Sequence, residues 1–120
     1  MARVNLCRQT GVAATVTLKS VFTDVLGNFA ASLKVANADR TTGDETYDAK
    51  IQDSPHGLDV ADADATWHDL VTFTQVAATS GSEKKTVTDP HYSRMRLVLT
   101  LGGTTPSADF EVDIEGLRVS

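Results

Sequence analysis

The stretch YSRMRLVLTLGGTTPSADFEVDIEG, residues 92–116, holds the two clearest strand patterns of the chain. Every second residue from Met95 to Leu101 is large and apolar, and apolar and acidic residues alternate from Phe110 to Ile114. Such alternation is typical of β-strands that have one face in a core and the other in water. Because GGTTP between the two runs is rich in turn residues, we predict that they form a hairpin through the two glycines.

The outward faces of this hairpin would carry opposite charges. One strand presents two arginines and the other presents four carboxylates, and together they form an outer charged face of Arg94, Arg96, Asp109, Glu111, Asp113 and Glu115. Opposite charges across a strand pair stabilise it by roughly 0.2–1 kcal/mol per pair. Two cations do not balance four anions, so a negative stripe remains. It is either a solvated surface or a docking site for a basic partner.

The same alternation recurs through the rest of the chain. It marks residues 12–22, 29–37, 45–53 and 66–77, and a short run at 84–88 has it with few apolar side chains. Turn residues separate these runs, and no segment shows a helical period. With the last two runs this makes about seven strands at short, regular spacing. We predict an all-β, single-domain antiparallel β-sandwich, Ig-like or jelly-roll-like.

Turn and core positions follow from the same pattern. Gly27-Asn28 is expected at the tip of a hairpin, and Pro55 is expected to end a strand because it has no N–H to donate. The expected core comprises Trp67, Phe73, Leu97, Leu99, Phe110, Val112 and Ile114. Trp67 has a second interpretation, since an exposed indole stacks on a sugar ring, but its phase with neighbouring apolar residues favours burial.

The length of 120 residues suits one domain with its own core. We assign residues 11–120 to the sandwich. Residues 1–10, MARVNLCRQT, come before the first clear strand and contain Arg3 and Arg8. We therefore expect an N-terminal arm with two basic side chains.

Composition argues against several classes of function. Eleven Lys+Arg against sixteen Asp+Glu give a net charge of −5, which disfavours binding to bare nucleic acid. No run approaches the ~18 apolar residues of a membrane span, and the apolar run VNLC is too short for a signal peptide. A single cysteine, Cys7, excludes an internal disulfide. We expect a protein made in a reducing cytosol that binds neither membrane nor nucleic acid.

A cation site would require oxygen ligands, and Asp59, Asp62 and Asp64 are the candidates. Calcium loops of the EF-hand type also need a glycine and a late glutamate, and the segment has Trp67 at the glycine position. The three histidines form no close metal-ligand pair. We therefore predict a polar loop, no bound metal and no cofactor.

Catalytic signatures are also missing from the sequence. There is no GxSxG nucleophile motif and no glycine-rich phosphate loop, and no signature surrounds Cys7. A cleft with two facing carboxylates is the arrangement that would make the chain an enzyme. The sequence favours a protein without catalytic activity.

Three segments resemble small virion proteins of tailed bacteriophages. They are YDAKIQDSPHG at 47–57, TWHDLVTFTQ at 66–75 and the run from Arg94 to Phe110, which includes LGGTTP. The acidic insert LDVADADA at 58–65 and TTP in place of TSP depart from the pattern. Such proteins are encoded in structural-gene regions beside the major capsid protein.

The resemblance implies a non-enzymatic virion structural protein, most specifically a capsid decoration or cement protein. Its partner would be the major capsid protein, on the outer surface of the icosahedral head. The resemblance also favours a homotrimer at a three-fold position, with Arg3 and Arg8 in contact with the capsid or a neighbouring subunit. Two alternatives stay open: a tail, neck or fibre component of the virion, and a carbohydrate- or cell-surface-binding β-sandwich module.

Overall fold

The computed structural model describes residues 2–57, 59–88 and 90–118, and every regular element within them is a β-strand. The strands are β1 (Ala2–Val12), β2 (Val16–Thr17), β3 (Val21–Phe22), β4 (Val25–Ala36), β5 (Thr46–Ser54), β6 (His68–Thr72), β7 (Gly81–Val87), β8 (Arg94–Gly102) and β9 (Ala108–Arg118). Over these ranges, we find no helix with the length and apolar character that a membrane crossing requires.

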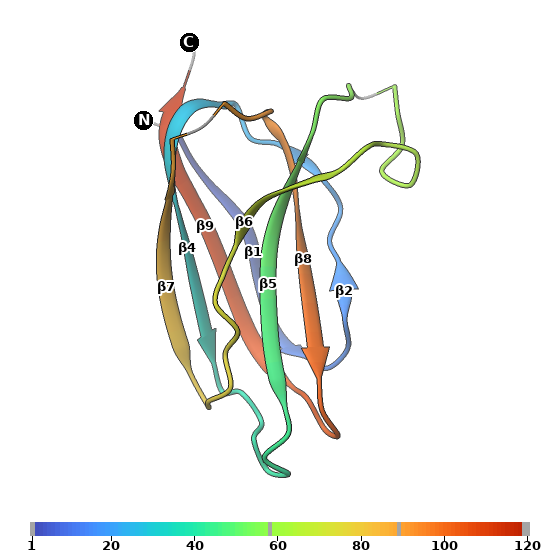
Figure 1. Cartoon of the computed structure of the whole chain (residues 1–120), viewed down its shortest axis with the longest axis vertical. Helices are drawn as coiled ribbons and strands as arrows, with labels where there is room; N and C mark the ends of the chain where they lie inside the picture. The colour runs from blue at the N-terminus through green and yellow to red at the C-terminus, as the bar shows by residue number, and fades with distance from the viewer. Residues whose placement is uncertain (1, 58, 89, 119–120) are drawn as a thin grey trace.

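The strands form two antiparallel sheets that face each other (Figure 1). Sheet A has the order β1-β9-β4-β7. Sheet B has the order β2-β8-β5-β6, and β3 also pairs with β8. The predicted all-β antiparallel sandwich is confirmed.

The strand pairs are nested around the connection between β5 and β6. β5 pairs with β6, β4 with β7, β2 and β3 with β8, and β1 with β9. The chain is thus one long antiparallel ribbon, folded back at residues 55–67 and wound so that β4 also pairs with β9 and β5 with β8. This nesting is the jelly-roll form of the sandwich, in which successive strands mostly alternate between sheets.

The core lies between the inner faces of the two sheets. Six of the seven residues that we expected in the core are there, each at most 2% exposed: Phe73, Leu97, Leu99, Phe110, Val112 and Ile114. The largest buried side chain is Tyr47 on β5, whose hydroxyl donates a hydrogen bond to the carbonyl oxygen of Asp39 at 2.6 Å. That bond satisfies the polar end of the tyrosine inside the core.

β8 and β9 do not form the expected hairpin. In sheet B, β8 lies between β5 on one side and both β2 and β3 on the other. In sheet A, β9 lies between β1 and β4. The two apolar faces are buried by facing each other across the core, not by lying side by side in one sheet. Arg94 and Arg96 are therefore on the opposite side of the molecule from the acidic residues of β9.

The first ten residues are not a separate arm. All described residues up to Val12 belong to β1, which pairs along the edge of sheet A with β9. The register shifts between Asn5 and Cys7, and again between Gln9 and Val12. These bulges interrupt the period of two, which is why alternation did not reveal the strand.

Two further expectations need correction. Residues 12–22 contain two separate two-residue strands, β2 and β3, and Phe22 is 48% exposed. Gly27-Asn28 is not a hairpin tip, because it lies within β4 where the register against β9 shifts between Val25 and Phe29. Gly27 has a φ of 105° at this irregularity, a conformation that glycine adopts readily.

The link from β8 to β9 crosses between the sheets against the backbone that precedes β5. Gly103 has a φ of 97°, and a Cβ at this position would lie 2.6 Å from the Cα of Glu45. The Glu45 carboxylate is fully buried and accepts hydrogen bonds from Thr42 and from the Thr105 hydroxyl at 2.9 Å. These hydroxyl bonds, that of Thr42 foremost, lower the pKa of Glu45 to about 2.

We predict that Gly103→Ala destabilises the fold much more than Gly43→Ala. Both glycines have positive φ, but a Cβ at Gly43 meets nothing within 4 Å. Backbone strain alone should cost Gly43→Ala about 1 kcal/mol, whereas strain plus the clash should cost Gly103→Ala about 3 kcal/mol. Urea denaturation of the two variants measures the difference. Equal losses would show that the close approach at Gly103 is unimportant.

Candidate functional site

The outer face of sheet A carries balanced charges. A row of carboxylates on β9 (Asp109, Glu111, Asp113 and Glu115) is flanked by basic residues on the other strands (Arg3, Arg8, Lys34 and Lys84). These eight residues define what we call the sheet A face. Four anions and four cations leave it no net charge, so the predicted negative stripe is not present on it.

Local pairs on the sheet A face follow the strand register. Arg3 lies opposite Glu115 and Arg8 lies opposite Glu111, with 3.4 Å between the Arg8 and Glu111 side chains. Asn37 donates a hydrogen bond to Asp109 at 2.8 Å, and this bond is the main cause of the lowered pKa of Asp109. Exposed pairs of this kind each stabilise the fold by only ~0–1 kcal/mol. Their main effect is on which surfaces can dock here.

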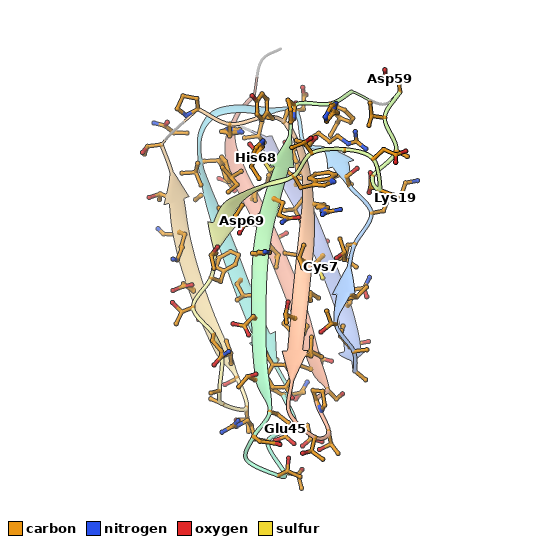
Figure 2. The ribbon with its side chains drawn as sticks, turned by 45° about the vertical axis from the view of Figure 1, so that its right-hand side comes forward. Cys7, Lys19, Glu45, Asp59, His68 and Asp69 are labelled. Atoms are coloured by element: carbon orange, nitrogen blue, oxygen red, sulfur yellow. The ribbon has the colours of Figure 1, made fainter. Side chains whose placement is uncertain are left out.

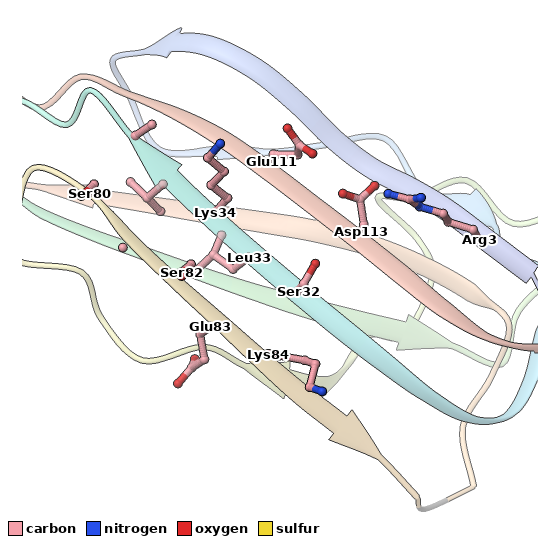
Figure 3. Close-up of a pocket in the computed structure, with 13 residues that line it drawn as sticks. Arg3, Ser32, Leu33, Lys34, Ser80, Ser82, Glu83, Lys84, Glu111 and Asp113 are labelled. Atoms are coloured by element: carbon pink, nitrogen blue, oxygen red, sulfur yellow. The ribbon is translucent and has the colours of Figure 1, made fainter.

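The sheet A face is also hollowed. A shallow depression of about 760 Å³ runs across β9, β4 and β7, and the side chains of Arg3, Lys34, Lys84 and Asp113 surround it (Figure 3). Ser32 occupies its middle with a small side chain. The depression is too open to enclose a small ligand, but it offers a shaped polar surface to a protein partner.

A second cluster lies on the outer face of sheet B, where residues 55–67 fold over the beginning of β8. We call it the arginine–tryptophan corner, and it consists of Arg94, Arg96, Trp67, Asp62 and Phe22. Lys19 and Asp59 lie at this end of the sandwich, and Glu45 lies at the opposite end (Figure 2).

Arg94 is the centre of the corner and is 4% exposed. Its guanidinium donates to Asp62 Oδ1 at 2.7 Å, to the Gly57 carbonyl oxygen at 2.8 Å and to Ser20 Oγ at 3.1 Å. A buried guanidinium requires such partners because an unpaired buried charge is very costly. Arg94 therefore fixes Gly57 and Asp62 against the sheet.

Asp62 is the counter-ion of Arg94. Its carboxylate accepts hydrogen bonds from the backbone N–H and the hydroxyl of Ser20, at 2.8 and 2.6 Å, besides the ion pair with Arg94. The hydroxyl bond from Ser20 is the largest cause of its pKa being lowered to about 2. Asp59 and Asp64 are exposed, and no group of potential metal ligands gathers within the described ranges.

Trp67 is not a core residue. It lies partly exposed on the outer face, where its ring covers the guanidinium of Arg96 at 4.2 Å and that of Arg94 at 5.4 Å. Its indole N–H donates to the carbonyl oxygen of Asp62 at 3.0 Å. Trp67 precedes β6, so its apparent phase with Val71 and Phe73 did not extend through a continuous strand.

Phe22 and Tyr92 add exposed aromatic rings at this end of sheet B. Phe22 lies opposite Arg94 across the β3–β8 pair and is 48% exposed, and Tyr92 is 49% exposed. Aromatic and arginine side chains are the types enriched at protein interfaces. Residues 22, 67 and 94 are far apart in the sequence, and the winding of the chain brings them together. Local periodicity does not report that winding, so the sequence did not reveal this grouping.

Comparison with known proteins does not assign this chain to a family. No protein-family model matches the chain, and no curated protein matches it. Among solved structures, a chain described as "Structure of infectious bursal disease virus Gx strain" matches with a TM-score of 0.47 and 13% sequence identity. That match covers 93% of this chain and 31% of the other chain. A likeness at this level assigns neither a family nor a function.

We predict that Asp62→Asn destabilises the protein by about 2 kcal/mol at neutral pH, because it leaves Arg94 without its counter-ion. The Asp62 side chain is 32% exposed, so the loss is smaller than for a fully buried pair. Its folded pKa lies below the unfolded value, so the stabilisation is complete above about pH 4 and is lost as the pH falls toward about 2. The gap between wild type and variant should therefore close over that range.

Asp64→Asn is the matched control for this measurement. Asp64 lies in the same loop, is exposed and makes none of the ion pairs found in the described residues. Its variant should follow the wild-type unfolding curve at every pH. If Asp62→Asn did the same, Asp62 would not hold the loop in place.

Proposed function

We propose that this chain is a non-enzymatic virion structural protein, and specifically a decoration or cement protein on the outer surface of a tailed-phage head. Its partner would be the major capsid protein, with assembly after synthesis in the host cytoplasm. Support comes from the segments that resemble small phage virion proteins, residues 47–57, 66–75 and 94–110. They fall on β5, β6 and β8, three neighbouring strands of sheet B, and on the start of β9.

The fold is compatible with this role without establishing it. Jelly-roll sandwiches occur in viral capsid domains and also in lectins, and a fold by itself does not imply a function. Support for this role must therefore come from the surface of the molecule.

The observation that carries the proposal is the charge balance of the sheet A face. Burying a surface with excess charge is costly, whereas four anions interleaved with four cations can exchange partners with a complementary surface. Such a face favours one docking register over others. Because Arg3 and Arg8 lie on β1 at its edge, we place the capsid or subunit contact there.

Repetition would turn a modest contact into a stable one. A decoration protein occupies many equivalent positions, and linked copies bind with an avidity above that of each single contact. A homotrimer would present three sheet A faces at once. Each bound copy would shift the equilibrium toward the assembled shell.

A second candidate function is carbohydrate or cell-surface binding. The exposed rings of Phe22 and Tyr92 favour it, since aromatic rings stack on sugars. Trp67 contributes less than the sequence suggested, because its ring already covers Arg96. A glycan array separates this candidate from the structural one.

We predict that particles of the virus encoding this chain contain it in a simple ratio to the major capsid protein, near one or one third. Quantitative mass spectrometry of purified particles measures that ratio. A few copies per particle would instead place the chain in the tail, neck or fibre. Absence from particles would overturn the virion role.

We predict that Arg8→Glu lowers incorporation into particles at least tenfold with little change in stability. The Arg8 side chain is 73% exposed, and its reversal places another anion beside Glu111. Lys19→Glu is the matched control, since Lys19 is exposed and lies between β2 and β3 of sheet B, away from the sheet A face. Equal incorporation of both variants would remove the sheet A face from the contact.

A further inference from the structure

Arg96 is a cation that the protein orients without pairing it to a carboxylate. Its Nε donates to Gln52 Oε1 at 2.8 Å, and none of the ion pairs in the described residues involves it. Arg94, two residues earlier, is saturated with acceptors. The two arginines thus have different roles on the same face.

The side chains around Arg96 fix the direction of its guanidinium. Gln52 accepts from Nε and in turn donates to Asp69 Oδ1 at 2.9 Å, while Asp69 also pairs with Lys50 at 3.2 Å. The Trp67 ring covers one face of the guanidinium at 4.2 Å. The head group is therefore held from its Nε side and across one face.

The terminal nitrogens of Arg96 remain available. They donate none of the hydrogen bonds present among the described side chains, and no buried side-chain nitrogen or oxygen in that part of the chain lacks a partner. It follows that these nitrogens reach solvent. Partial burial lowers the pKa of Arg96, but a guanidinium stays protonated at neutral pH.

The acidic groups nearest to Arg96 are already engaged. Asp62 is held by Arg94 and Ser20, and Asp69 is held by Gln52 and Lys50. Neither carboxylate can turn to Arg96 without breaking those contacts. An anion for Arg96 would have to come from another molecule.

We propose that Arg96 binds a single carboxylate, an Asp or Glu side chain of a partner protein. The guanidinium fork matches a planar carboxylate with two parallel hydrogen bonds. Phe22 is exposed, and its ring lies 6.0 Å from the guanidinium of Arg94, so it adds an apolar surface to the same face. The contact lies on sheet B and does not depend on the virion role or on the sheet A face.

A carboxylate fits better than a phosphate. Asp62 and Asp69 lie close by, and the chain as a whole has a net charge of −5, so a dianion or a polyphosphate chain would be repelled. A single guanidinium fork can neutralise one carboxylate without further basic residues.

The experiment uses Trp67 as its own reporter, because it is the single tryptophan of the chain and touches Arg96. The full-length protein is titrated with acetyl-Gly-Gly-Glu-Gly-Gly-amide, which carries a single carboxylate, at constant ionic strength, and tryptophan fluorescence is recorded. We expect a saturable change in the millimolar range, as one exposed fork would give. The glutamine version of the peptide should give none.

Variants test whether Arg96 is the receptor. Arg96→Gln should weaken the response at least tenfold, and Arg96→Lys should weaken it several-fold because lysine lacks the fork. Lys19→Gln is the matched control, because Lys19 is an exposed cation outside the arginine–tryptophan corner, and this variant should behave as wild type. The ¹⁵Nε resonance of Arg96 in the unmodified protein gives a second readout that does not depend on a variant folding.

Each contrary result overturns the proposal. No saturable response, or an unchanged ¹⁵Nε resonance of Arg96, would exclude carboxylate binding at this site. An equal response to inorganic phosphate would show a general anion site. Loss of the response in Lys19→Gln as well as in Arg96→Gln would show attraction to the whole protein.

Discussion

The structure depends on burying the apolar faces of two strands that follow each other in the chain. β8 and β9 both have an uninterrupted inner row, and each row needs a full apolar surface opposite it. Side by side in one sheet they would have exposed one common face. As inner strands of separate sheets, they cover each other across the core, with β1 and β4 beside β9 and with β2, β3 and β5 beside β8. The nested ribbon is the winding that achieves this with short connections.

That winding also determines where charge gathers. The outward residues of β9 lie between β1 and β4, so their carboxylates meet arginines and a lysine from segments far away in sequence. The outward residues of β8 lie under the ribbon's fold-back at 55–67, so Arg94 becomes buried. A charge that is buried needs fixed partners, and the loop conformation follows from supplying them. The two outer faces therefore differ because the ribbon covers one and leaves the other open.

The sequence predicted what local alternation can report. Strands β4, β5, β7, β8 and β9 were found, and so was the inward set of residues on the last two, because each has an unbroken period of two. β1 was missed because its bulges break that period, and Trp67 was misplaced because the phase of a strand was extended into the loop before it. The hairpin was wrong because alternation gives faces but not partners. Which strand lies beside which depends on the global winding.

The candidate surfaces were harder to predict for the same reason. Asp62 looked like a cation ligand because aspartates cluster around it, yet its ion pair with Arg94 spans 32 positions of sequence. The acidic row of β9 looked unbalanced because its cations lie in β1, β4 and β7. In both cases the sequence shows which charged residues are present but not which residues they pair with. Buried polar groups are specified by what they contact, which periodicity does not encode.

Neither outer face should attract a partner over a long distance. The sheet A face has no net charge, so it exerts little long-range attraction, and docking there depends on register between close pairs. Arg96 is a single cation between engaged acids, so its attraction is also short-range and is felt only once an acceptor reaches the fork. An acidic protein with both features is kept from sticking to polyanions while retaining specific contacts. Selectivity on both faces would thus arise from geometry at contact, and net charge would serve mainly to exclude the wrong partners.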